Sequence, residues 1–436
     1  MFSLFGNKKN TATVSDEIRA WLEENFLWLI ETFGTAHFSE SLFIIPSESN
    51  FPFLDLTDNR QFDGFFLKLC QYAQLDGSSV WLKFFDDSDS MQFYFWTSGV
   101  EQKHTLSTFY RNPGIGEKQY VIELSTSLLK APTELTSTLA RQLMYVKLIK
   151  DGHINSANPE LAPLADLAAI FMGFGLVIAN AAKPITKIGY HNSPNLNSDE
   201  TAYALAMLLK ATDMHDHAAI PFLNTEVKDS LKQNLKYIQN SNADTLITQK
   251  KVSECNLIFN LSAQVEDFRK RFKFHEALEK ADEILKIRPA DGGTFNVIGY
   301  LFLQQKKYKE SIDFFNRAIE VYHNYDAAIN NRGYAWLQLG FFDEAYSDFE
   351  SAREINPENA FVWRNLGVYH LMRQNYQEAL SFFKEAEGLN QQTELIHFFM
   401  ALAYHKIGDS ENAHHYFTRS KTQNEFNDSV LEYPLI

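Results

Sequence analysis

Cysteine is scarce in this chain, which has Cys70 and Cys255 among its 436 residues. Two cysteines give no disulfide framework of the kind that small secreted domains need, and they suit a reducing compartment. The first residues place Lys8 and Lys9 after a few apolar residues, which is the reverse of the order in a secretory signal peptide. We therefore expect a cytoplasmic protein.

Basic charge and long apolar runs are also lacking. The chain has 40 Lys and Arg against 55 Asp and Glu, a formal net charge of −15, and no segment forms a basic patch. This excludes nucleic acid and an anionic membrane as the main partner. The longest uncharged apolar stretch is Leu167–Ala179, which contains Gly173 and Gly175. It is too short for an ordinary membrane span and predicts a buried core helix.

The length and the 45% apolar content predict two globular domains. Residues 1–250 indicate an α+β domain, and residues 258–422 an all-α solenoid followed by a tail at 423–436. The first domain has four expected strands, Leu42–Ile45, Val80–Phe85, Gln92–Trp96 and Tyr120–Leu124. Its expected helices are Ser15–Thr32, with Ser15 as N-cap, Pro132–Lys150, Leu164–Ala182, Asp199–Thr212 and Asn224–Gln239.

The C-terminal part repeats with an unbroken period of 34 residues. The units begin at Ile258, Gly292, Asp326, Ala360 and Glu394. The third unit has Gly333 and Ala345 at its eighth and twentieth positions, Phe349 at its twenty-fourth and Pro357 near its end. The small residues let two helices of one unit approach, the aromatic fills the space against the next unit, and the proline ends the second helix. The pattern resembles the tetratricopeptide repeat (TPR), with degenerate outer units that suit the caps of a solenoid.

In that family the first helix of each unit lines a concave, protein-binding face. The corresponding fifth, ninth and twelfth positions here are Asn296, Tyr300, Leu303, Asn330, Tyr334, Leu337, Arg364, Val368, Leu371, Phe398, Leu402 and His405. The lysines of carboxylate-gripping TPRs are missing, and the lining is aromatic and aliphatic. It favours an apolar helix or an extended protein segment as the partner, or else packing on the N-terminal domain.

Two segments of the N-terminal domain, Thr138–Leu148 and Ala162–Asn180, resemble a bacterial family of zincin-like (gluzincin-type) metallopeptidase domains, as do Gly189-Tyr190 and Tyr203–Ala206. The resemblance implies a zinc site with two His ligands, a general-base Glu and a third ligand Glu, together with an Asp that orients the first His. The matching residues here are Arg141, Tyr145, Gln142, Ala162 and Asp166.

Four of those five residues cannot do the zincin chemistry. Arg141 is a permanent cation without a lone pair for zinc, and Tyr145 is protonated near neutral pH. Gln142 cannot take a proton from water, and Ala162 has no ligand atom. The domain is therefore predicted to be a pseudopeptidase that needs no metal or cofactor. Asp166 remains, and we expect it to form an ion pair with Arg141, with a capping or solvent-facing role as the alternative.

The function indicated is a non-catalytic adaptor, scaffold or regulator that binds a protein or peptide. An inhibitory or immunity-type protein that neutralises a toxin, effector or peptidase is the alternative. Three other motifs do not indicate a functional site. Met214–His217 does not match an established metal-ligand set, and Asn112–Gly116 is typical of a hairpin turn. His414-His415 is typical of a helix surface. The tail holds Val430, Leu431, Tyr433, Leu435 and Ile436, and we expect it to fold back onto the fifth repeat.

Overall fold

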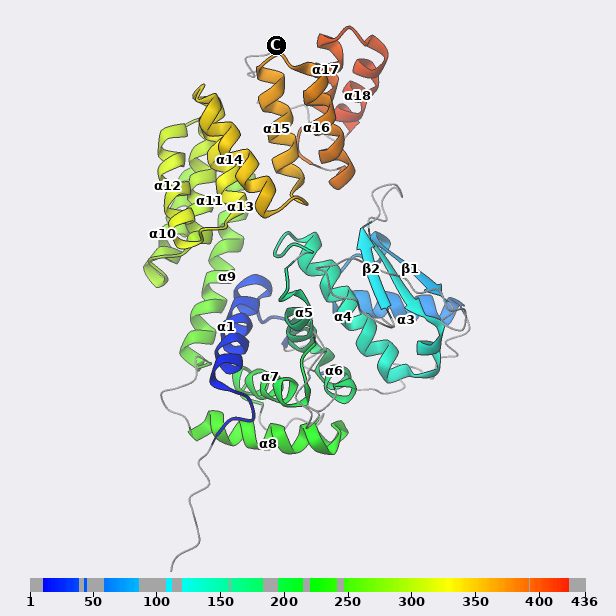
Figure 1. Cartoon of the computed structure of the whole chain (residues 1–436). Helices are drawn as coiled ribbons and strands as arrows, with labels where there is room; N and C mark the ends of the chain where they lie inside the picture. The colour runs from blue at the N-terminus through cyan, green and yellow to red at the C-terminus, as the bar shows by residue number, and fades with distance from the viewer. Residues whose placement is uncertain are drawn as a thin grey trace, which may run out of the picture. The chain divides into compact units, whose positions relative to one another are not determined.

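The computed structural model describes residues 11–38, 43–44, 59–85, 107–111, 120–156, 158–182, 195–214, 220–240, 247–391 and 393–422. The chain divides into two compact units, Met1–Asn260 and Leu261–Ile436, and the division falls inside helix α9 (Gln249–Lys270). Figure 1 labels the helices and strands of both units.

A mixed three-stranded sheet forms one part of the N-terminal unit. Its strands are β1 (Val80–Phe85), β2 (Ser107–Arg111) and β3 (Tyr120–Ser125), in the order β1-β3-β2. Strand β1 runs parallel to β3, and β2 pairs antiparallel with the other edge of β3. Strand β3 is therefore central, and its hydrophobic residues Val121, Ile122 and Leu124 are fully buried.

Helix α4 (Pro132–Lys150) links the sheet to the helical part of this unit. It contacts β2 on one side and helices α5 (Leu161–Ala169) and α6 (Gly175–Ala181) on the other (Figure 1). The common core also takes in α1 (Asp16–Phe33), α3 (Asn59–Tyr72), α7 (Ser198–Ala211) and α8 (Thr225–Asn240). Because α4 is buried along most of its length, its polar residues must find partners inside the protein.

Helices α5 and α6 are two parts of one apolar helical segment that is interrupted at Gly173. A π-helical turn spans Ile170–Phe174, and Gly173 has φ +96°, which favours glycine. The carbonyl of Gly173 accepts from Ile44 N, and His37 Nε2 bonds to the carbonyl of Phe171, both at 2.9 Å. Among the described helices, Leu161–Ala181 alone is long and apolar enough to cross a membrane, and 89% of its most apolar stretch is buried inside the protein.

The C-terminal unit is built from successive helices. After α9 come α10 (Phe274–Ile287), α11 (Gly292–Gln304), α12 (Tyr308–Val321), α13 (Asp326–Gln338), α14 (Phe342–Ile355), α15 (Ala360–Met372), α16 (Tyr376–Leu389), α17 (Ile396–Lys406) and α18 (Ser410–Thr422). From α11 onward they contact one another as four hairpins, and each hairpin coincides with one predicted 34-residue unit.

The fifteenth residue of every predicted unit confirms the register. These residues lie in the turn between the two helices, and all five have positive φ angles between 57° and 83°: Phe272, Lys306, Gly340, Gln374 and Gly408. The first unit follows the same backbone pattern although its sequence is degenerate. The five-unit period is therefore a property of the backbone as well as of the sequence.

Close packing explains the glycine at the eighth position. A Cβ added to Gly299 would meet the ring of Phe315 at 2.6 Å, and one added to Gly333 would meet Phe349 at 2.9 Å. The aromatic at the twenty-fourth position thus packs on the glycine of its own unit. We expected this aromatic to fill space against the next unit, and Phe383 does stack on Phe399 of the following unit at 5.9 Å. The expectation did not include the contact with the glycine of the same unit.

Most elements predicted from the sequence are confirmed. Helix α4 has the expected bounds, the other expected helices of the first unit agree within three residues, and Ser15 caps α1 through a bond from Ile18 N. The expected strand Leu42–Ile45 is wrong at its two described residues, Phe43 and Ile44, which have no strand structure. Strand β2 was not predicted. Gln92–Trp96, Asn112–Gly116, His215–His217 and the tail 423–436 lie outside the described residues.

Candidate functional site

Arg141 and Asp166 form an ion pair between α4 and α5. Arg141 Nε lies 2.5 Å from Asp166 Oδ1, and the side chains are 18% and 0% exposed. The second carboxylate oxygen, Oδ2, accepts from the backbone N–H of Leu196 at 3.0 Å, directly before the N-cap of α7. The expected ion pair is confirmed, and the solvent-facing alternative for Asp166 is wrong because the side chain is fully buried.

Burial sets the electrostatics of this pair. Burial raises the pKa of the Asp166 carboxyl, while the Arg141 guanidinium and the N–H of Leu196 favour its charged form. Tyr145, one turn after Arg141 on α4, is close enough to feel both charges, and burial raises the pKa of its phenol. Tyr145 therefore stays neutral near neutral pH.

Gln142 points to the sheet instead of to α5. Its Nε2 donates to the Ser107 hydroxyl on β2 at 2.8 Å, so residues 141 and 142 connect α4 to two different neighbours. Ala162 lies one turn before Asp166 on α5. A guanidinium, an amide, a neutral phenol and a methyl group are not zinc donors, so the residues at these positions do not fit the metal that the resemblance implies. No cluster of three metal-ligating side chains occurs among the described residues.

The predicted lining of the repeats separates into accessible and buried residues. Tyr300, Leu303, Tyr334, Arg364 and Leu402 are half-buried, as is Asn296, and His405 is exposed. The other five are buried in the array itself: Asn330, Leu337, Val368, Leu371 and Phe398. For these five the predicted groove position is wrong, because successive first helices contact each other and bury the side chains between them.

Asparagines on successive first helices form an amide ladder that the sequence reading missed. Asn331 Nδ2 donates to Asn296 Oδ1 at 3.1 Å, and Asn365 Nδ2 donates to Asn330 Oδ1 at 3.0 Å. In both bonds the sixth residue of one unit donates to the fifth residue of the unit before it. The sequence could have indicated these bonds, because Asn recurs at the fifth and sixth positions of successive units. The ladder therefore uses two of the predicted lining residues to join units.

Three arginines near the first helices already make hydrogen bonds within the array. Arg269 binds Glu266 through two bonds of 2.7 Å and lies over the Tyr300 ring at 5.6 Å. Arg332 binds Asp348 at 2.7 and 2.9 Å. Arg364 donates to the side chain of Asn365 and to the carbonyl of Glu394. An incoming carboxylate would compete with an acidic side chain at Arg269 and Arg332, whereas Arg364 has neutral acceptors only.

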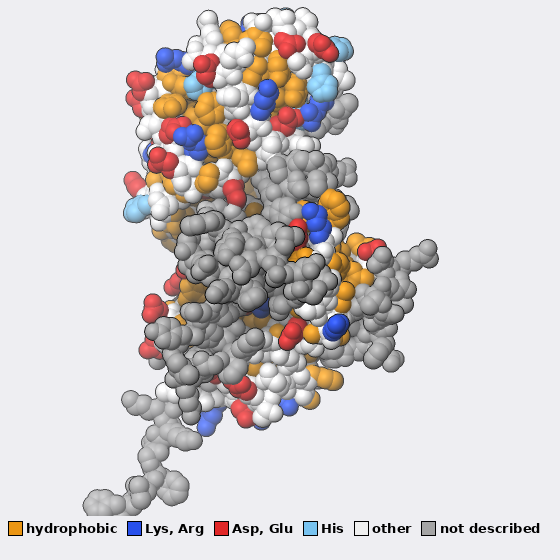
Figure 2. All heavy atoms as spheres, turned by 45° about the vertical axis from the view of Figure 1, so that its right-hand side comes forward, with side chains coloured by type: hydrophobic (Ala, Val, Ile, Leu, Met, Phe, Trp, Pro, Cys, Tyr) orange, Lys and Arg blue, Asp and Glu red, His pale blue; other side chains and the backbone are white. Residues whose placement is uncertain are grey.

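The surface of the C-terminal unit has a mixed character. Figure 2 shows hydrophobic side chains there beside acidic, basic and histidine residues. The exposed aromatic residues of this unit include Phe272, Tyr322, Phe341, Tyr346 and Phe361. His414 and His415 are both exposed on α18, which confirms the helix-surface interpretation of that pair.

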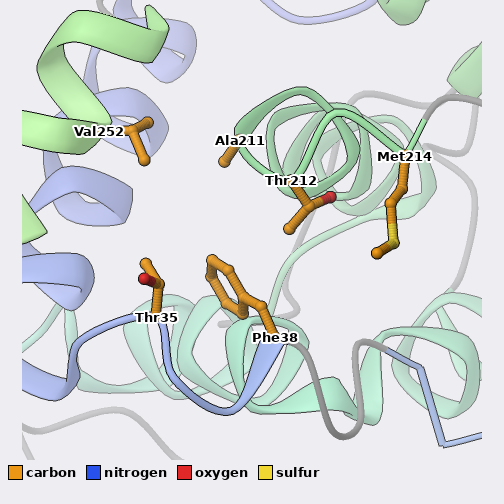
Figure 3. Close-up of a pocket in the computed structure, with 6 residues that line it drawn as sticks. All are labelled: Thr35, Phe38, Ala211, Thr212, Met214 and Val252. Carbon is orange, nitrogen blue, oxygen red and sulfur yellow. The ribbon is translucent and has the colours of Figure 1, made fainter.

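One apolar cavity of about 250 Å³ lies within the N-terminal unit. Thr35 and Phe38 after α1, Ala211 and Thr212 at the end of α7, Met214, and Val252 of α9 line it (Figure 3). The side chains of Phe38 and Val252 point into the shared space. Among the described residues, its lining has two hydroxyls and no charged side chain, so these residues do not supply the convergent polar groups that orient a specific ligand.

Known protein families and structures match the repeats. Tetratricopeptide repeat families match residues 293–325 and 330–392. Together with the hairpins and their register, these matches show that the C-terminal unit is a TPR array. Neither match reaches the N-terminal unit, and no curated protein matches the chain.

Three solved structures illustrate the likeness. MamA is 16% identical with a TM-score of 0.30, over 39% of this chain and 97% of its own. The MamA fragment 41-end of Desulfovibrio magneticus RS-1 is 16% identical with a TM-score of 0.31, over 38% and 95%. A thermophilic TPR protein of Thermus thermophilus is 17% identical with a TM-score of 0.36, over 39% and 93%. At these values the likeness transfers no partner or activity to this chain.

Proposed function

We propose that this chain is a non-catalytic, cytoplasmic adaptor whose TPR array binds a segment of another protein. The observation that carries the proposal is the composition of the accessible lining, where Tyr300, Leu303, Tyr334 and Leu402 offer aromatic and aliphatic surface. Of the neighbouring arginines, Arg269 and Arg332 are paired with acidic side chains, and Arg364 bonds to neutral acceptors. This favours an uncharged, largely apolar helix or extended segment over an acidic peptide.

Tyr334 is expected to be a main contact of that partner. Replacing Tyr334 by lysine should weaken binding by about 30-fold or more, the effect of losing a hot-spot residue of roughly 2 kcal/mol. Melting should change little because the residue is only half-buried. The measurement is photo-crosslinking from host lysate with benzoylphenylalanine at position 334, followed by titration of the recovered partner.

The matched control is Tyr322, which is 50% exposed at the C-cap of α12, outside the first helices. A crosslinker there should give no specific adduct, and Tyr322→Lys should bind normally. Equal crosslinking at the two positions, or full binding by folded Tyr334→Lys, would place the partner elsewhere.

For the N-terminal unit, we propose a zincin-like frame whose metal chemistry has been lost. Support comes from the positions of Arg141 and Tyr145 one turn apart on α4, with Asp166 and Ala162 on the contacting helix α5. Such a helix pair would bring a third ligand on α5 toward two ligands on α4. In this chain the ion pair of Arg141 and Asp166 replaces the ligands.

Introducing the zincin-type His and Glu residues at these four positions should give the protein a zinc site. The native protein should contain well under about 0.1 Zn²⁺ per chain after dialysis, because its side chains include no donor set at these positions. The variant Arg141→His/Gln142→Glu/Tyr145→His/Ala162→Glu should contain about one. Metal content by mass spectrometry is the measurement. A folded fourfold variant that binds no zinc would show that the frame is not zincin-like.

A further inference from the structure

The apolar cavity beside the ends of α1 and α7 and the start of α9 is accessible from the surface. Met214 at its rim is 42% exposed, whereas Phe38 and Val252 on its walls are 8% exposed each. The side chains of Phe38, Val252 and Ala211 point into the space (Figure 3). Its volume of about 250 Å³ exceeds the roughly 150 Å³ that is enough for a benzene molecule in an apolar cavity. A small ligand can therefore both enter the cavity and fit inside it.

Most polar groups around the cavity are occupied by hydrogen bonds within the protein. The hydroxyl of Thr212 bonds to the backbone carbonyl one turn earlier on α7, at 2.9 Å. The backbone N–H groups of Phe38, Thr212, Met214 and Val252 all donate to nearby carbonyl groups. Among the described lining residues, the hydroxyl of Thr35 is the side-chain polar group that makes no such bond. A bound water needs two to four polar partners, so this lining holds water weakly and favours an apolar occupant.

We propose that this cavity binds a small, uncharged aromatic molecule. The ring of Phe38 points into the cavity, and aromatic pairs gain more free energy than their buried area alone provides. The thioether of Met214 is polarizable and makes favourable contacts with the edge of a ring. Because Met214 lies at the rim, one hydroxyl or N–H group of the ligand can remain in contact with water at the open side.

The lining disfavours two other classes of small ligand. It contains no charged side chain among the described residues, so an ionised carboxylate would lose part of its hydration without gaining a counter-charge. A saturated ring of the same size would fit the space but would lack the interactions with the Phe38 ring and the Met214 sulfur. All six lining residues belong to the N-terminal unit, so this site goes beyond the proposed groove of the repeats and does not depend on it.

Three probes of similar size separate these classes. The full chain, labelled with ¹³C in its methionine methyl groups, is titrated with 4-methylphenol, 4-methylcyclohexanol and 4-methylbenzoate, and the Met214 signal is assigned with Met214→Leu. We expect 4-methylphenol to shift the Met214 signal with a dissociation constant of roughly 0.3–3 mM, a range open to so small a ligand. 4-Methylcyclohexanol should bind at least about threefold more weakly, and 4-methylbenzoate at least about tenfold more weakly.

Variants of the lining, checked for folding by circular dichroism, place the ligand in this cavity. Ala211→Leu adds bulk inside the space and should weaken the binding of 4-methylphenol at least about tenfold. Phe38→Leu keeps an apolar wall without the ring and should reduce the affinity for 4-methylphenol to that for 4-methylcyclohexanol. The matched control is Ala20→Leu, at an exposed position of α1, which should bind 4-methylphenol as the native protein does.

Three outcomes would overturn the proposal. The first is equal affinity for 4-methylphenol and 4-methylcyclohexanol, since the ring would then contribute nothing. The second is a Met214 signal that does not saturate, which indicates general partition onto apolar surface. The third is unchanged binding by folded Ala211→Leu, which would place the ligand outside the cavity.

Discussion

Asp166→Ala is expected to lower the free energy of local unfolding of α4 and α5 by about 3 kcal/mol. The change leaves the guanidinium of Arg141 without its counter-charge and the N–H of Leu196 without its acceptor. Breaking a buried ion pair from one side costs roughly 3–5 kcal/mol, and the partial exposure of Arg141 places the cost at the lower end. Native-state hydrogen exchange of α4 and α5 peptides measures it without assuming one transition for both units.

Two comparisons make this result specific. Arg141→Met/Asp166→Leu replaces the pair by apolar side chains and should cost at most about 1 kcal/mol, much of it from the unpaired Leu196 N–H. Asp16→Ala breaks a surface pair, in which Asp16 is 95% exposed and 3.2 Å from Arg19, and should cost less than about 0.5 kcal/mol. If Asp166→Ala costs no more than Asp16→Ala, the buried pair does not hold the two helices together.

The sequence was informative where one local rule determines the structure. The 34-residue period predicts the hairpins because glycine at the eighth position and an aromatic at the twenty-fourth pack together in each of the three middle units, as Gly299 and Phe315 do. The pair of Arg141 and Asp166 was predicted from the resemblance, which places Asp166 beside the ligand position that Arg141 occupies. These features depend on few neighbours.

The lining of the repeats could not be predicted by position alone. The same position is half-buried in one unit and fully buried in another, as Tyr334 and Val368 show for the ninth residue. The difference depends on side chains of the next unit, which a period does not specify. Strand β2 was missed although Ser107–Arg111 pairs with the next strand in the sequence, β3, because the propensity of this short segment alone does not specify a strand.

Val368→Asp is expected to unfold the end of the repeat array locally. Val368 is fully buried in a cluster that includes Leu366, Leu371 and Phe399 of the fourth and fifth units. An unpaired carboxylate there must be desolvated or protonated, and the packing of the valine is lost, so we expect a cost of about 3–5 kcal/mol.

In a repeat protein each unit is stabilised mainly by its neighbours, so the loss should remain local. Hydrogen exchange should accelerate strongly in α15–α18 and little in α11 and α12. The matched control is Val297→Asp on α11, where the valine is 36% exposed and the same substitution should cost less than about 1 kcal/mol. If Val368→Asp keeps native exchange in α15–α18, then Val368 lies on an accessible lining after all, and Val368→Asp should instead abolish binding of the partner.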